Sequence, residues 1–337
     1  MNENELKKHK KYMLRCIEIA KRNSSKHYPN PSVGALVLKN DIIISEGVTS
    51  DYGGNHAEVN AIKPLQNKTD LSNAILYVTL EPCSHQGKTP PCTELIYKSG
   101  IKNVIIGALD ISSKVNGKGI SYLKTKGINV ISGICEDKCN QLHKNFLHYN
   151  KHKRPYIILK WAKSKDQFIA PLKKDDNRPF LISSNKSRQL VHKWRSEEHS
   201  ILVGYNTVID DNPTLDVRHV NGNNPIRIVL DDKKSLKNDF NVFNDFSETI
   251  SINYYLKYKN PAKFICKKLF EKNIQSVIIE GGKKTLDLFI NENLWDEARV
   301  FESNTILNSG IRSPKLNGTI LIEQKVGDDM LKIFKPN

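Results

Sequence analysis

The chain has 337 residues, of which 38% are hydrophobic, and it is long enough for two domains that each bury a core. No run of about 18 or more apolar residues occurs, which excludes a membrane-spanning helix, and the lysine-rich N-terminus has no apolar stretch of the secretory type, so a cytoplasmic protein is expected. The 52 Lys and Arg exceed the 36 Asp and Glu and give a net charge of +16, but they are scattered along the whole chain, which argues against a nucleic-acid partner.

The first part of the chain alternates between helix-like and strand-like segments. Apolar residues recur at helical spacing over 6–21, and residues 39–41 separate two short apolar runs, as in a β-hairpin. The expected elements are, in chain order, a helix at 6–21, strands at 35–38 and 42–45, a helix at 55–62, a strand at 75–80, a helix at 93–98, a strand at 104–107, a helix near 120–126, a strand near 129–131 and a helix at 136–149. This alternation predicts a layered α/β domain.

A short basic segment at 151–155 has no core residues, and we expect the domain boundary there, which gives domains 1–150 and 151–337. The second domain again alternates strands with helices and is expected to be α/β. Its expected strands are 156–161, 201–204, 226–230, 277–279 and 298–301, its helices are 186–197, 261–272 and 283–290, and a loop is expected at 173–178.

Three residues of the first domain suit a hydrolytic zinc site. Such a zinc takes three protein ligands and keeps one position open, which one imidazole and two thiolates from His56, Cys83 and Cys92 would satisfy. Water on this zinc has a pKa of roughly 7, so hydroxide is available at neutral pH. Glu58, two residues after His56, is placed to take the proton of that water and return it to a leaving amine.

The order His-x-Glu, then Pro-Cys, then a second Cys is typical of zinc nucleobase deaminases. Either half alone is more often a coincidence, because short motifs recur and buried structural cysteines are common. Both halves of the motif occur in the expected order and on the expected helices and loop, and this combination favours a zinc site. His85 is a competing ligand for which a polar loop contact is preferred. The other cysteines are expected to pack as reduced thiols; they are Cys16, Cys135, Cys139 and Cys266.

These residues and the runs around them resemble the bifunctional riboflavin-biosynthesis deaminase-reductases. In the first half the resemblance lies in PNPSVG at 29–34, HAE at 56–58 and TLEPCSHQGKTPPC at 79–92, where eight residues separate the two cysteines. In the second half it lies in LK at 159–160, SKD at 164–166, ILVG at 201–204, DNPTL at 211–215, PIRIV at 225–229 and EGG at 280–282. The resemblance covers nearly the whole chain and is weakest over about the last 25 residues.

The resemblance implies a cytidine-deaminase-like three-layer α/β/α domain followed by a dihydrofolate-reductase-like α/β domain. The first domain, with one zinc per chain, would use zinc-bound hydroxide to deaminate 2,5-diamino-6-(5-phosphoribosylamino)pyrimidin-4(3H)-one. The second would use NADPH to reduce the ribosyl group and give 5-amino-6-(5-phosphoribitylamino)uracil. A homo-oligomer is also implied. The second half has no metal motif and no Gly-x-Gly-x-x-Gly fingerprint, so its hydride must come from a cofactor bound in another way than in a Rossmann domain.

Carried over position by position, the resemblance implies three groups of site residues. In the deaminase, Glu58 is the general acid and base, and the pyrimidine contacts are Asn30, Lys88 and Asp110. In the reductase, the substrate phosphate would be held by Lys160, Ser183 and Arg195, and the rest of the substrate by Asp211, Asn212, Leu215, Arg218 and Glu280. The residues beside NADPH would be Trp161, Asp166, Gly204, Thr207, Gly281 and Gly282. By themselves, EGG and DNP are more often simple turns.

The sequence departs from the family pattern at a few positions. Thr49 stands where the family has a pocket histidine, and residues 110–113 read DISS where the family has Asp-Pro-Asn-Pro, which bears on substrate affinity. Gln167 replaces the glycine of a Ser-x-Asp-Gly signature, and the part after Asn308 is short and lacks the usual glycine pair. Two alternatives follow: a deaminase with a structural second domain, against which the phosphate-binding residues argue, and a zinc nucleic-acid deaminase, against which the long inter-cysteine loop argues.

Overall fold

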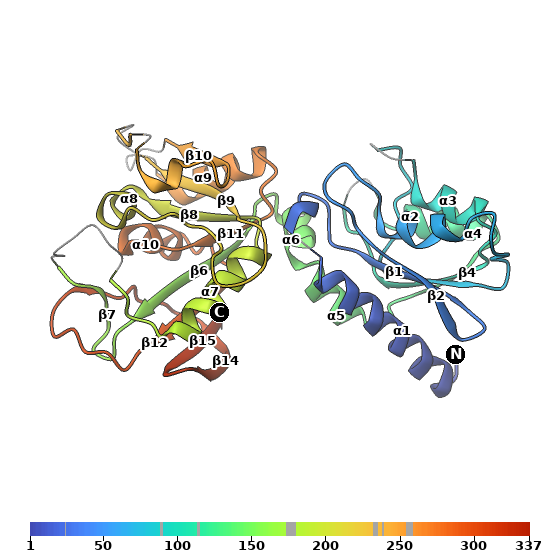
Figure 1. Ribbon diagram of the computed structural model, residues 1–337, viewed down its shortest axis with the longest axis horizontal. Coiled ribbons are helices and arrows are strands. Elements are labelled where there is room, and N and C mark those ends of the chain that lie inside the picture. The colour runs from blue at the N-terminus through green and yellow to red at the C-terminus, as the bar shows by residue number, and fades with distance from the viewer. Residues whose placement is uncertain are drawn as a thin grey trace. The chain divides into compact units, whose positions relative to one another are not determined.

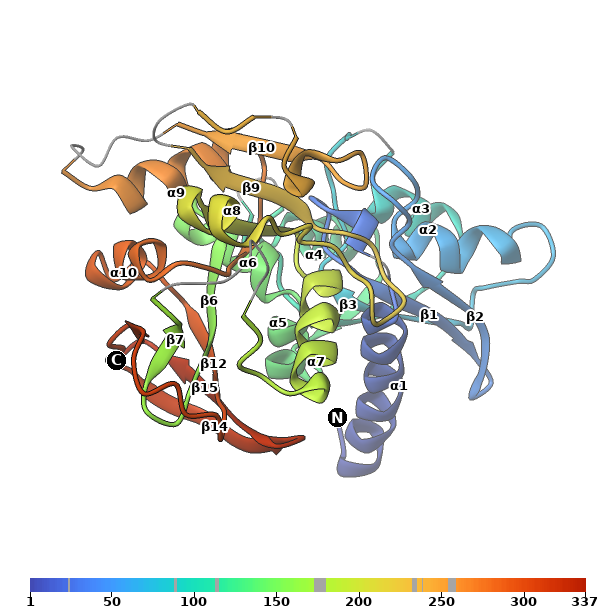
Figure 2. The same ribbon diagram turned by 60° about the vertical axis from the view of Figure 1, so that its left-hand side comes forward.

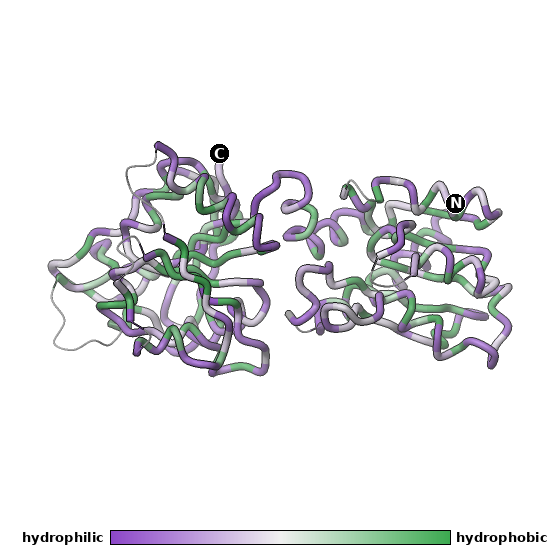
Figure 3. The backbone as a smooth tube through the Cα atoms, turned by 90° about the horizontal axis from the view of Figure 1, so that it is seen from above, coloured by the Kyte–Doolittle hydropathy of each residue, from purple (hydrophilic) through white to green (hydrophobic). Residues whose placement is uncertain are grey.

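The computed structural model describes residues 1–23, 25–87, 90–112, 115–172, 180–231, 235–237, 239–253 and 259–337. Its contacts divide the chain into two compact units, Met1–His152 and Lys153–Asn337 (Figure 1). Each unit has its own sheet and its own hydrophobic core, as Figure 3 shows by the apolar colouring of the central strands. None of the described helices is long and apolar enough to cross a membrane.

The first unit is built on a five-stranded sheet with the order β2-β1-β3-β4-β5. Its strands are β1 (Gly34–Lys39), β2 (Ile42–Val48), β3 (Ile75–Leu80), β4 (Asn103–Ala108) and β5 (Asn129–Ser132). β1 is antiparallel to β2 and β3, whereas β3, β4 and β5 are parallel. β1, β3 and β4 are almost entirely buried, as expected for strands covered on both faces.

Helices cover both faces of this sheet. They are α1 (Glu3–Lys21), α2 (Ala57–Ile62), α3 (Cys92–Lys98), α4 (Lys118–Thr125), α5 (Glu136–Leu142) and α6 (Lys144–His152), with short 3-10 turns at Ser25–His27 and Lys63–Leu65. α2, α3 and α4 pack together on one face, and α1 and α5 lie on the other (Figure 1). The expected three-layer α/β/α architecture is therefore confirmed. The helix expected at 136–149 is instead two helices, α5 and α6.

The second unit has an eight-stranded sheet with the order β10-β9-β8-β11-β6-β12-β15-β14, so that β10 and β14 are its edges (Figure 2). The strands are β6 (Tyr156–Lys163), β8 (Ser200–Gly204), β9 (Ile226–Leu230), β10 (Thr249–Ile252), β11 (Ser276–Ile279), β12 (Glu297–Glu302), β14 (Thr319–Val326) and β15 (Asp329–Lys335). The first six are parallel, and β15 and β14 continue the sheet antiparallel. β7 (Phe168–Ala170) and β13 (Ile311–Arg312) form a separate pair.

Side chains alternate across β6, so the second unit has core on both faces of its sheet. Ile157 and Leu159 belong to one cluster and Ile158 to another. The covering helices are α7 (Asn185–Glu197), α8 (Tyr205–Asp211), α9 (Pro261–Glu271) and α10 (Lys283–Asn291), and a 3-10 turn lies at Asn241–Phe243. All five strands and three helices expected from the sequence are present. The loop expected at 173–178 lies outside the described residues.

Candidate active sites

One edge of the first sheet collects the chemically active residues of this unit. The carboxyl ends of the parallel strands β3 and β4 lead to Cys83 and Asp110. Because β1 is antiparallel to β3 and β2 is antiparallel to β1, the start of β1 and the end of β2 reach the same edge, and they bring Asn30 and Thr49. The topology therefore gathers side chains that lie far apart in the sequence.

The expected zinc ligands come together at this edge. His56 precedes α2, Cys92 is the first residue of α3, and the ligand atoms of His56, Cys83 and Cys92 all lie within 4.8 Å of one another. His56 Nδ1 is 3.2 Å from Cys92 Sγ and 3.6 Å from Cys83 Sγ. A tetrahedral zinc with bonds of about 2.0 to 2.3 Å holds its ligand atoms roughly 3.6 Å apart, so these residues fit the ion.

The pKa values of Cys83 and His56 also suit this group to binding a cation. Hydrogen bonding with the Cys92 thiol, aided by His56, lowers the pKa of Cys83, so one sulfur is readily a thiolate. Hydrogen bonding to Cys83 raises the pKa of His56 to about 9. Metal binding therefore exchanges a proton held on this group for the ion. Among the described residues, no other three His, Cys, Asp or Glu side chains form such a group.

Glu58 lies in the first turn of α2 beside the ligands and is only 4% exposed. Burial raises the pKa of its carboxyl, and the neighbouring His56 acts in the opposite direction. A raised pKa favours a carboxyl that can hold a proton as well as release one, which is what a general acid and base requires.

The loop that carries Asn30 is held by its neighbours. The Asn30 carbonyl lies 2.7 Å from Nδ1 of His27, whose pKa is lowered by burial. Thr49 Oγ1 accepts from the Val33 N–H at 2.9 Å and donates to the Pro31 carbonyl at 3.0 Å. Thr49 therefore fastens the loop next to Asn30. Lys88, the other expected pyrimidine contact, lies outside the described residues.

Asp110 is buried directly after β4, and its carboxylate accepts from the Ser112 N–H at 2.7 Å. Burial raises the pKa of Asp110, and the nearby His85 has a smaller, opposite effect. Asn30 and Asp110 are thus on opposite sides of β3, with the zinc ligand Cys83 following that strand between them.

In the second unit, Lys160, Arg195 and Glu280 form a buried ionic cluster. Arg195 Nε and Nη2 donate to the two oxygens of Glu280 at 3.1 and 2.8 Å, and Lys160 Nζ lies 3.7 Å from Glu280. Burial disfavours the Glu280 carboxylate, but Arg195 and Lys160 outweigh this effect and lower the pKa of Glu280 to about 2. The cluster therefore holds a permanent charge inside the unit.

Ser183 does not join this cluster. It precedes α7, whereas Arg195 lies in the last turn of that helix, so the two residues lie near opposite ends of α7. Ser183 instead lines a separate hollow at the start of α7, together with Ser184, Asn185, Lys186, Arg188, Gly327 and Asp328.

The glycines of the second unit meet at the carboxyl ends of the parallel strands β8 and β11. A Cβ on Gly204 would lie 2.3 Å from Thr285 Oγ1, and one on Gly281 would lie 3.0 Å from Thr207 Oγ1. Gly204 therefore packs against α10 and Gly281 against α8. α8 begins after Gly204 and α10 after Gly282, so both helices start at these strand ends, as helices do at the phosphate sites of dinucleotide-binding proteins.

Comparison with known proteins finds matches to both units. Residues 6–108 match the model of the cytidine and deoxycytidylate deaminase zinc-binding region, and residues 155–314 match that of the RibD C-terminal domain. The riboflavin biosynthesis protein RibD of Aquifex aeolicus is 36% identical, over 97% of this chain and 98% of its own length. The RibD of Bacillus amyloliquefaciens is 36% identical, over 90% of this chain and 86% of its own.

A solved structure agrees over the full length. The diaminohydroxyphosphoribosylaminopyrimidine deaminase/5-amino-6-(5-phosphoribosylamino)uracil reductase of Thermotoga maritima superimposes with a TM-score of 0.89 at 34% identity, and the match covers 99% of this chain and 100% of that one. The chain belongs to the RibD family. It is a bifunctional enzyme of riboflavin biosynthesis, with a zinc-type deaminase and an NADPH-dependent reductase, as the sequence predicts. The two alternative functions are not supported.

Several expected reductase contacts of this RibD family member are also used within the fold. The Trp161 indole N–H donates to Ser313 Oγ at 3.0 Å. The Asp166 carboxylate accepts from the Ser164 hydroxyl at 2.6 Å and the Asn308 N–H at 2.7 Å, so it holds the loop after β12. Gln167 adopts a left-handed φ of 71°. Glycine adopts this backbone without strain, so the replacement of the signature glycine by Gln167 bears on stability.

The segment expected to line the substrate is tied to Arg195. Asn212 and Leu215 have left-handed backbones, and Leu215 is 4% exposed and packed in the core, so its side chain is committed to folding. Arg195 Nη1 donates to the Asp216 carbonyl at 3.1 Å. Arg218 pairs with Asp216 at 3.2 Å.

His192 is a residue that the sequence analysis did not name and that contacts the segment expected to line the substrate. Its Nδ1 accepts from the Arg218 N–H at 3.2 Å, and it lies three residues before Arg195 on α7. Burial, assisted by Arg195, lowers the pKa of His192 to about 4, so its imidazole is neutral. The helical spacing of 192 and 195 is the signal that would have found it.

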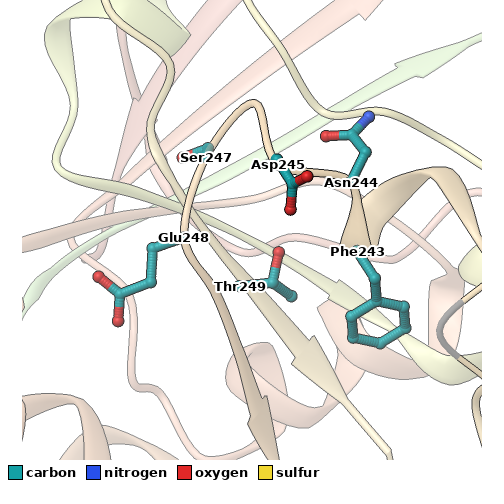
Figure 4. A pocket seen from close by; sticks show the side chains of 6 residues that line it. All are labelled: Phe243, Asn244, Asp245, Ser247, Glu248 and Thr249. Carbon is teal, nitrogen blue, oxygen red and sulfur yellow. The ribbon is translucent and has the colours of Figure 1, made fainter.

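One more hollow lies before β10 and is lined by Phe243, Asn244, Asp245, Ser247, Glu248 and Thr249 (Figure 4). Its wall is held from inside by Arg227, which is 1% exposed and donates to Asn244 Oδ1 at 2.7 Å and to the Asn244 and Ser247 carbonyls. The ionisable groups in its lining are two carboxylates, which suit neither a phosphate nor a dinucleotide. We assign this hollow to neither activity.

Proposed function

We propose that the first unit hydrolyses the 2-amino group of 2,5-diamino-6-(5-phosphoribosylamino)pyrimidin-4(3H)-one and that the second unit reduces the resulting 5-amino-6-(5-phosphoribosylamino)uracil. The product is 5-amino-6-(5-phosphoribitylamino)uracil. The Thermotoga maritima enzyme, which is named for these two substrates, supports the proposal because it matches over the full length. The separation of the two residue groups into two compact units supports one activity for each.

For deamination, His56, Cys83 and Cys92 would hold zinc, which when bound supplies a Lewis acid that makes a water molecule acidic. Glu58 takes a proton from that water and delivers it to the leaving amine, so water and the C–NH2 group become C=O and ammonia. The burial of Glu58 beside the ligands supports this role. Asn30, Asp110 and Lys88 hold the pyrimidine, and the shared sheet edge supports the first two.

For reduction, NADPH would supply the hydride, which adds to C1′ of the ribosyl group while a proton adds to the ring oxygen that leaves that carbon. Gly204, Thr207, Gly281 and Gly282 hold the phosphates of the dinucleotide, and their position at two helix starts supports this. Trp161 and Asp166 border the same cofactor from the end of β6.

The buried ionic cluster holds the substrate of the reductase. Lys160 and Arg195 bind its anionic end. Three of the five N–H donors of Arg195 bond to Glu280 and to the Asp216 carbonyl, and the remaining two suit phosphate oxygens. Glu280 accepts from ribosyl hydroxyl groups. The loop with Asp211, Asn212, Leu215 and Arg218 closes the site, and Ser183 contacts the substrate from the start of α7.

The same proposal includes a cytoplasmic homo-oligomer that binds no nucleic acid. All six cysteines are free thiols, as is usual in a reducing compartment. The ligands proposed for both sites carry phosphate groups, which explains the basic residues in these sites without a nucleic-acid partner.

The observation that carries the proposal is the group His56, Cys83 and Cys92 with Glu58 buried beside it, on one chain with the glycine-lined strand ends. The test is an assay of full-length protein on the diaminopyrimidine phosphate that follows ammonia and NADPH absorbance. Ammonia is expected without NADPH, and NADPH oxidation only after deamination. Ammonia release with no NADPH oxidation at any substrate concentration would refute the second activity, and absence of ammonia would refute the first.

A further inference from the structure

Glu81 is a buried carboxylate between the two loops that build the deaminase site. It follows β3, precedes Pro82 and the ligand Cys83, and is 4% exposed. Its own N–H donates to the Ala108 carbonyl at 3.0 Å, which extends the pairing of β3 and β4 to the point where both strands end. Neither the zinc chemistry nor the substrate contacts proposed above use this side chain.

Four backbone N–H groups from one segment donate to the Glu81 carboxylate. Oε1 accepts from Gly119 and Ile120 at 2.9 and 3.1 Å. Oε2 accepts from Gly117 at 3.1 Å and Asp110 at 3.3 Å. The first three donors lie at the start of α4, where N–H groups have no partner in the helix and a negative charge is favoured. Glu81 thus caps α4 from a neighbouring strand.

Close packing reinforces the same connection. A Cβ on Gly119 would lie 2.1 Å from the Pro82 carbonyl oxygen, so the first turn of α4 rests directly on the residue before Cys83. At the other end of the bonded segment, the Asp110 carboxylate is oriented by its bond from Ser112 at 2.7 Å. The position of Asp110 relative to Cys83 is therefore set through Glu81.

We propose that Glu81 is a positioning residue for deamination, which sets the place of the pyrimidine-binding Asp110 loop relative to the zinc ligand Cys83. The inference rests on the function proposed above for Asp110 and Cys83. In Glu81→Gln, the amide turns an NH2 donor toward backbone N–H donors, so part of the segment loses its acceptor. The zinc ligands themselves are unchanged. The KM of the diaminopyrimidine phosphate is therefore expected to rise by about tenfold, with kcat and zinc content near those of the wild type.

The experiment measures ammonia release, zinc per chain and NADPH oxidation on the deaminated substrate for the full-length wild type, Glu81→Gln and Glu94→Gln. Glu94 is the matched control, because it is exposed on α3 and pairs with Lys98. The expected result is a raised KM for Glu81→Gln alone, with NADPH oxidation unchanged in all three proteins. Glu81→Asp keeps the charge on a side chain one methylene shorter and should give an intermediate KM; it decides the question if Glu81→Gln does not load zinc.

Two results overturn the inference while the wild type releases ammonia. One is an unchanged KM in Glu81→Gln and Glu81→Asp. The other is a joint loss of zinc and kcat with KM unchanged, which a purely structural role would produce. A wild-type protein that loads zinc yet releases no ammonia would instead refute the proposed function, and this inference with it.

Discussion

The replacement Glu280→Gln is expected to destabilise the second unit strongly, because it leaves Arg195 and Lys160 buried beside a neutral group. Their charges lower the pKa of Glu280 from 4.5 to about 2. At about 1.36 kcal/mol per pKa unit, this shift corresponds to on the order of 3 kcal/mol of stability at pH 7. The loss of a buried ionic partner generally costs about 3–5 kcal/mol, which agrees with this magnitude.

The stabilisation of the second unit by Glu280 should depend on pH in a definite direction. The folded pKa is below the unfolded one, so the stabilisation by Glu280 is fully present above about 4.5 and is lost as the pH falls toward about 2. The difference between the wild type and Glu280→Gln should therefore be constant near neutral pH and shrink as the pH falls below about 4.5.

Tryptophan fluorescence can follow this unit within the full-length chain, because all three tryptophans, Trp161, Trp194 and Trp295, belong to it. With a urea m-value of about 2 kcal/mol per M, the unfolding midpoint should fall by roughly 1.5 M at pH 7. The control Glu323→Gln removes the carboxylate that pairs with Lys332, is 49% exposed, and should change stability by less than about 1 kcal/mol. A Glu280→Gln protein as stable as this control, or a difference that does not decrease in acid, would refute the reasoning.

Three further outcomes follow from the structure. Gln167→Gly should raise the stability of the second unit by about 1 kcal/mol, because Gln167 has a φ of 71°; an unchanged unfolding midpoint in tryptophan fluorescence would show that this backbone is not strained. Glu58→Gln should keep one zinc per chain and slow ammonia release by about 10²–10⁴-fold, and an active variant would remove its role as general acid and base. Cys83→Ser and Cys92→Ser should each reduce the zinc content measured by atomic emission while NADPH oxidation on the deaminated substrate continues, and a double mutant that is fully loaded would contradict the ligand assignment.

The zinc group was predictable from the sequence because its chemistry demands particular residue types at particular spacings. One imidazole, two thiolates and a carboxyl two residues from the imidazole leave few interpretations, and the structure brings His56, Cys83 and Cys92 together as expected. The central strands of both units were predictable for a related reason. Strands buried on both faces are continuous apolar runs, as in β3, β4 and β11.

The last strands of the second unit were missed because their side chains give little signal. β14 is exposed at nearly every residue, and only its pairing with β15 makes it part of the sheet. Backbone pairing of this kind leaves no apolar alternation in the sequence.

The sequence by itself determined the group of one histidine and two cysteines, the carboxyl beside it, and the α/β character of both units, because these depend on residue chemistry and local periodicity. Tertiary structure alone decided which charged side chains meet. Arg195 bonds to Glu280, although the two residues are 85 positions apart in the chain. It also decided that Glu81 accepts from the backbone N–H groups of Asp110, Gly117, Gly119 and Ile120. Backbone N–H groups are the same at every residue, so a sequence holds no mark of which ones will face a buried carboxylate until the strands and helices are packed.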